Sequence, residues 1–177
     1  MKGRTTSRLG AMVLVLSLMT ACHQISYQEQ QPMQDLLNAY LSRQIPAADL
    51  TITYHIGDDF SGETYLELRG DGVYELWSTA TAGRQRRSYS GQTDQAAVEN
   101  LARSMIEQRL WEVQHVRSKP GEDDPLVSIQ VATPANRAEV LLWISEVRQV
   151  AAFAAVQAEL LDLIHSLSNH EILEGGR

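Results

Sequence analysis

Cys22 is the only cysteine of the 177-residue chain, and its position links it to a particular chemistry. An apolar run over residues 11–19 lies just before it, and three basic side chains precede that run. A basic start, a short apolar core and small residues before a cleavage point are typical of a secretory signal, which is too short to span a bilayer stably. The pattern therefore predicts that residues 1–21 are removed and that a lipid is attached to the Cys22 thiol.

The residues around this cysteine, Leu-Met-Thr-Ala-Cys at positions 18–22, resemble the lipobox of bacterial lipoproteins. Met19 stands where leucine is most usual in that family. The resemblance implies a thioether-linked diacylglycerol on Cys22, an acylated amino group and a permanent membrane anchor. His23 stands where enterobacterial lipoproteins of the inner membrane carry aspartate, so the resemblance also implies the outer membrane, on its periplasmic side.

The alternative is ordinary secretion with Cys22 as an unpaired thiol. Ordinary cleavage requires small residues at the first and third positions before the cut, and Met19 would occupy the third. A single leftover thiol is also a liability in an oxidising compartment. Both arguments favour the lipoprotein interpretation.

The histidines and acids are candidates for acid–base or metal chemistry, but their spacing matches no known motif. No two histidines lie on one helix face with an acid between them, and no serine lies in a Gly-x-Ser-x-Gly elbow. The acidic groups lack the alternate spacing of a calcium loop and are typical of turns. We expect no metal and no cofactor. The alternative is an envelope hydrolase with a site assembled from His55 or His115 and loop carboxylates.

Two sets of residues are candidates for binding a partner. The first set is a cluster of three arginines in an otherwise acidic chain: Arg84, Arg86 and Arg87. These arginines either protect an edge strand from pairing with another sheet or bind an acidic partner or anionic glycan. Trp77 and Trp143 lie on different strands, each on the strand face opposite the predicted core. They would form a binding surface if one face of the sheet is open, whereas strands buried on both faces would give the same pattern.

Charge restricts the partners further. Loss of Lys2, Arg4 and Arg8 with the signal leaves a net charge of −10 in place of −7. A body this acidic is repelled by phosphate-rich surfaces, which argues against nucleic acid as a partner. The same repulsion acts at anionic headgroups, so we expect the lipid on Cys22 to provide the membrane attachment.

Hydrophobic periodicity gives the elements that must position these residues. Residues 22–32 are polar and form a tether, residues 33–168 form a single domain, and residues 169–177 form a frayed tail. A period of three to four predicts helices near 33–44, 94–109 and 149–168. A period of two predicts strands near 51–56, 64–68, 73–77, 84–90, 127–131 and 140–144.

This order of elements predicts an α+β fold, in which a meander and a hairpin form an antiparallel sheet of about six strands with two or three helices on one face. Residues 51–168 resemble small domains of unknown function in bacterial secreted proteins, through a Gly-Asp-Gly-aromatic hairpin, a helix ending in Leu-Trp and an acidic proline-containing loop. That resemblance supports the fold and supplies no activity. We expect a lipid-anchored binding, structural or accessory module of the periplasm, with an envelope protein or a glycan as partner.

Overall fold

The computed structural model describes residues 31–58, 62–79, 85–114 and 124–172. Within these ranges an antiparallel sheet has the strand order β4-β3-β2-β1-β5-β6. The first four strands form a meander, and β5 and β6 form a hairpin that pairs with β1. The strands are β1 (Thr51–Asp58), β2 (Gly62–Arg69), β3 (Val73–Thr79), β4 (Arg86–Gln92), β5 (Leu126–Ala132) and β6 (Arg137–Trp143).

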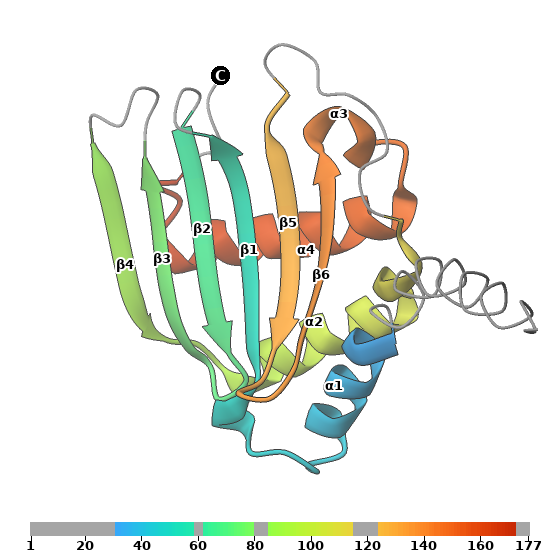
Figure 1. The fold of residues 1–177 in the computed structure, drawn as a ribbon. Coiled ribbons are helices and arrows are strands. Elements are labelled where there is room, and N and C mark those ends of the chain that lie inside the picture. The colour runs from blue at the N-terminus through green and yellow to red at the C-terminus, as the bar shows by residue number, and fades with distance from the viewer. Residues whose placement is uncertain (1–30, 59–61, 80–84, 115–123, 173–177) are drawn as a thin grey trace, which may run out of the picture.

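The helices lie against one face of this sheet, and α4 crosses behind the strands (Figure 1). The helices are α1 (Gln31–Leu41), α2 (Gln95–Glu107), α3 (Ile144–Val147) and α4 (Ala151–Leu167), with short 3-10 turns η1 (Ala47–Asp49) and η3 (Leu110–Glu112). The predicted α+β fold, with a meander and a hairpin in one antiparallel sheet, is confirmed. None of the described helices is long and apolar enough to cross a membrane.

The core forms between the helices and every second residue of the strands. Strand side chains alternate between the two faces of a sheet, so Ile52 and Tyr54 of β1 point toward the helices and are fully buried. Phe153 of α4 is also fully buried in this core. Each such apolar side chain stabilises the fold by about 1.5–3 kcal/mol. The buried Tyr54 hydroxyl accepts a hydrogen bond of 3.0 Å from Nε2 of Gln157, which joins β1 to α4.

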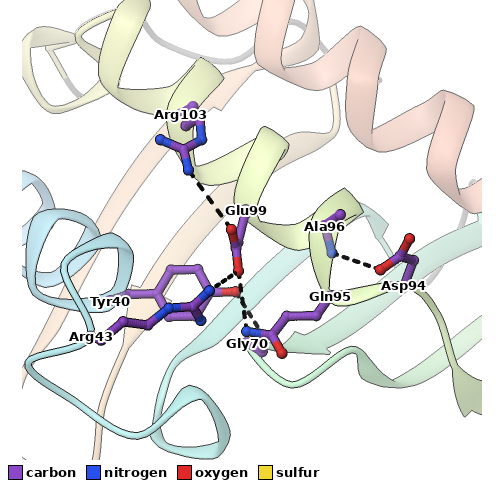
Figure 2. A network of polar contacts seen from close by, with 8 residues as sticks. All are labelled: Tyr40, Arg43, Gly70, Asp94, Gln95, Ala96, Glu99 and Arg103. Carbon is purple, nitrogen blue, oxygen red and sulfur yellow. Dashed lines mark hydrogen bonds and ion pairs between the residues drawn. The ribbon is translucent and has the colours of Figure 1, made fainter.

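A polar network joins α1 to α2 beneath the turn between β2 and β3 (Figure 2). The buried hydroxyl of Tyr40 donates to the carbonyl oxygen of Gly70 at 2.8 Å. Arg43 forms an ion pair of 2.6 Å with Glu99, which Arg103 also approaches at 3.7 Å. Burial, and then the negative charge of Glu99, raises the pKa of the Tyr40 hydroxyl. The network fixes the β2–β3 turn against two helices.

Several element boundaries differ from the prediction. Helix α1 begins at Gln31, within the predicted tether, because proline is well tolerated in the first turn of a helix. Residue 144, predicted as strand, begins α3. Within the predicted tail, Asn169, His170 and Glu171 are exposed, whereas Ile172 is 4% exposed; Glu171 accepts a hydrogen bond from the Tyr89 hydroxyl. Residues 173–177 lie outside the described residues.

Candidate functional site

The helices leave one face of the sheet uncovered by other described elements, and we call it the open face (Figure 1). Because side chains alternate along each strand, the open face carries the residues that lie between the core positions. One row runs across all the strands, since its members are direct partners in the strand register. The row contains Leu141, Ser128, His55, Tyr65, Trp77 and Ser88.

Stacked rings occupy the centre of this row. The Tyr65 and Trp77 rings are nearly parallel, with centroids 5.3 Å apart and an angle of 17° between their planes. His55 tilts against Tyr65 at 6.3 Å. From β4, the guanidinium carbon of Arg86 lies 4.5 Å from the centroid of the Trp77 ring. Since β3 lies between β2 and β4, Tyr65 and Arg86 cover opposite faces of Trp77 in a stacking and cation–π arrangement.

A shallow hollow of about 650 Å³ lies beside this stack. Its lining includes short side chains of β1 and β5, namely those of Thr51, Thr53, Ser128 and Ala132. Longer side chains of β2, among them Glu63, Tyr65 and Glu67, form its wall. Short residues beside long ones therefore produce a depression that runs along the strands.

Carboxylates give the hollow its charge. Glu63 and Glu67 line it, and neither lysine nor arginine is among its lining residues. Oε2 of Glu67 accepts a hydrogen bond of 2.9 Å from the Tyr65 hydroxyl. Burial and then this hydrogen bond to Glu67 raise the pKa of Tyr65 to about 12, so the phenol stays a proton donor at neutral pH.

The structure brings together only part of the predicted binding set. Trp77 and Arg86 are in direct contact on the open face. Trp143 lies on the same face, but β2, β1 and β5 separate its strand from that of Trp77, so the two tryptophans do not form one patch. Arg87 points toward the helix side, where it donates to the carbonyl oxygen of Glu171 at 3.0 Å.

Strand β4 is an edge of the sheet, which agrees with the edge-protection interpretation of its arginines. A role for these arginines in docking a partner stays a prediction. Arg84 and the lipidation candidate Cys22 lie outside the described residues.

Among the described residues, the contacts required for a hydrolase are incomplete. His55 lies in the hollow with Glu63 and Glu67, and Ser128 is its direct partner across the strand pair. In the described part of the chain, however, no hydrogen bond or ion pair joins His55 to a carboxylate or to Ser128. An activated serine needs both of those contacts. The other candidate, His115, lies outside the described ranges.

The described residues also contain no group of three or more histidines, cysteines or acids placed to hold a metal ion. The rings of His165 and His170 approach each other at 6.3 Å near the end of α4, and two imidazoles alone do not make such a site. Metal chemistry therefore gains no support from the ranges that the structure describes.

Sequence reasoning missed Tyr65 and the glutamates of β2 and β3. The core residues predict the strand near 64–68, but alternation alone does not show which residues of the next strand lie beside Tyr65 and Glu67. Register was the missing information. The Gly70–Gly72 turn pairs Tyr65 with Trp77 and Glu67 with Glu75, so the turn and the alternation together contain the signal.

Comparisons with known proteins add no relative to this picture. No protein family model matches the chain, and a comparison with curated proteins gave no significant match. The features that bear on function are therefore the geometry of the open face and the residues around Cys22.

Proposed function

We propose that this protein is a lipid-anchored binding module of the bacterial cell envelope, which faces the periplasm and takes its partner on the open face of its sheet. The observation that carries the proposal is the hollow of about 650 Å³ on a sheet whose other face is filled by helices. Ligand sites are usually concave, and their linings combine aromatic side chains with placed polar groups.

The anchor is the second part of the proposal. The basic start, the apolar run and the lipobox-like residues support lipid attachment at Cys22, and the acidic body gives no electrostatic attraction to anionic headgroups. Several acyl chains, each contributing about 0.8 kcal/mol per buried methylene group, hold a protein at a membrane effectively permanently.

The anchor is tested by replacing Cys22 with serine. We expect Cys22→Ser to abolish the incorporation of labelled palmitate and to release the protein from the membrane fraction. Normal membrane retention of this variant, with the signal removed, would overturn the anchor.

The binding face is tested by photo-crosslinking in the intact envelope. A photoreactive residue at Ser90, exposed on the open face, should capture an envelope partner. The matched control places the same residue at Asp162, exposed on α4 on the helix side. Equal capture from both positions, or capture from Asp162 alone, would contradict the assignment of the open face.

Catalysis is the alternative function, and the hydrolase hypothesis has its own test. Alanine at His55 and at Ser128 would abolish hydrolysis of envelope material if these residues formed a nucleophile and base. If the protein is the proposed binding module, we expect the purified parent and both variants to hydrolyse envelope material no faster than buffer alone.

A further inference from the structure

The open face carries carboxylates that the domain itself does not neutralise. Elsewhere some acids are paired, such as Glu99 with Arg43 and Asp71 with Arg69, each at 2.6 Å, whereas Glu107 and Asp162 take part in no ion pair among the described residues. Among the described residues, no ion pair includes Glu63, Glu67 or Glu75. What distinguishes the open face is that two of these carboxylates, Glu63 and Glu67, line a hollow whose lining contains no lysine or arginine.

Two of these carboxylates are direct neighbours. Glu67 of β2 and Glu75 of β3 are opposite each other in the strand register. Like charges directly opposite on antiparallel strands destabilise a sheet. The hydrogen bond that Glu67 receives comes from the neutral Tyr65 hydroxyl, which does not cancel its charge. The fold therefore tolerates a repulsion that any added cation would relieve.

Three arginines lie on the same face beside the hollow, and none forms an ion pair with its glutamates among the described residues. Arg86 lies over the Trp77 ring, and Arg69 is paired with Asp71. Arg137 lies at the start of β6, the edge strand opposite β4, where its register partner is Ala132. None of the three lines the hollow.

Other classes of ligand fit this surface less well. A sugar ring stacks on an exposed aromatic face, and both faces of Trp77 are covered, one by Tyr65 and one by Arg86. An anion would meet the uncompensated charges of Glu63 and Glu67. No described cluster of acids is placed to hold a metal ion.

We propose that the hollow binds an extended basic segment of a partner protein, whose lysine or arginine side chains pair with Glu63 and Glu67 in its lining and with Glu75, the register partner of Glu67 beside it. The inference rests on the proposed binding function of the open face and names the chemistry of its occupant. Charge complementarity favours a basic occupant, since the lining of the hollow carries negative charge and no lysine or arginine.

The strand geometry also sets the spacing of the basic residues. Glu63 and Glu67 are four residues apart on β2, and a strand rises about 3.3 Å per residue, so they lie about 13 Å apart along the strand. A partner segment in extended conformation spans the same distance between residues four apart. We expect lysines or arginines at that spacing in the bound segment.

The test measures peptide binding to the detergent-solubilised full-length protein. The probes are a peptide with lysines four residues apart, the same peptide with glutamates in place of the lysines, and a neutral oligomer of N-acetylglucosamine. We expect binding of the lysine peptide alone, with an affinity that falls as salt concentration rises. Preferential binding of the glutamate peptide or of the oligosaccharide would overturn the inference.

A charge-matched pair of variants locates the site. We expect the double variant Glu67→Gln, Glu75→Gln to weaken binding of the lysine peptide about fivefold to tenfold, since exposed ion pairs are individually modest. The control is Glu107→Gln with Asp162→Asn, which removes the same charge from exposed helix positions. Equal effects of the two double variants would show a response to net charge only and would overturn the site.

Thermal unfolding of each variant shows that it is folded, and the Glu67–Glu75 variant should be at least as stable as the parent.

The two proposals can fail separately. If the photoreactive residue at position 90 crosslinks an envelope partner but the lysine peptide does not bind, this inference fails and the proposed binding function stands. If neither occurs, both fail.

Discussion

Replacing Glu75 with glutamine should stabilise the domain. Glu75 is directly opposite Glu67, and the Cβ atoms of such partners are about 4.5–5.5 Å apart. Two unit charges about 5 Å apart repel by about 0.8 kcal/mol in water and by about 3 kcal/mol at an effective dielectric constant of 20. The Glu75 side chain is exposed, so the value for water is the better guide. We expect Glu75→Gln to raise the free energy of unfolding by about 0.5 kcal/mol, within the usual range for cross-strand pairs.

The assay is urea denaturation followed by circular dichroism, at low ionic strength and in 1 M NaCl. The Debye length is about 3 Å at 1 M salt, so the gain should largely disappear there. In a thermal melt the same gain corresponds to about 1–2 °C for a domain of this size.

Glu139→Gln is the control for this prediction, because it removes one charge from the same face without removing a like-charge pair. Glu139 is opposite Gln130, and we expect a change close to zero. The repulsion between Glu67 and Glu75 is refuted if Glu75→Gln lowers stability. It is also refuted if both variants gain equally, since relief of net charge would then explain the effect without the local pair.

Three further predictions concern the turn beside the site and the phenol within it. Gly72→Ala should cost about 2 kcal/mol or more in chemical denaturation, because Gly72 has φ of 89° and a Cβ there would lie 2.3 Å from the carbonyl oxygen of Thr93. Tyr40→Phe should cost about 1–2 kcal/mol in the same assay, since it leaves the Gly70 carbonyl without its buried donor. Tyr65 should titrate near pH 12 in ultraviolet absorbance, a transition that Tyr65→Phe lacks and that Glu67→Gln moves to lower pH. Because the folded pKa is raised above 10, the unfolded phenol ionises first, and this group's contribution makes stability fall as pH rises from about 10 to about 12.

The elements of this fold could be predicted because their signals are local. Asp94 caps α2 through a hydrogen bond from the Ala96 amide, and the sequence places a helix start at that point. The alternation of Ile52 and Tyr54 with polar residues shows which face of β1 is buried. Both depend on residues a few positions apart, which interact in the same way in most folds.

The arrangement of the site was harder to predict because it depends on strand order. Sequence alternation places Trp77 and Trp143 on one face, but their separation is set by β1, which pairs with both β2 and β5. The contact of Arg86 with Trp77 depends on the register of β3 and β4, which local sequence patterns do not fix. Non-local pairing, not local propensity, decides which side chains meet.

The charge of the chain has opposite consequences for its two proposed attachments. Anionic lipid headgroups repel an acidic body, so the proposed membrane attachment is through a lipid on Cys22, and that attachment should not depend on salt. A basic partner is attracted by the same acidity, concentrated at the hollow by Glu63 and Glu67, so that attachment should weaken as salt is added. A salt wash of intact membranes therefore separates the two: it should release the partner while the protein itself stays bound. Simultaneous release of both would mean that electrostatics, and not a lipid, holds the protein at the membrane.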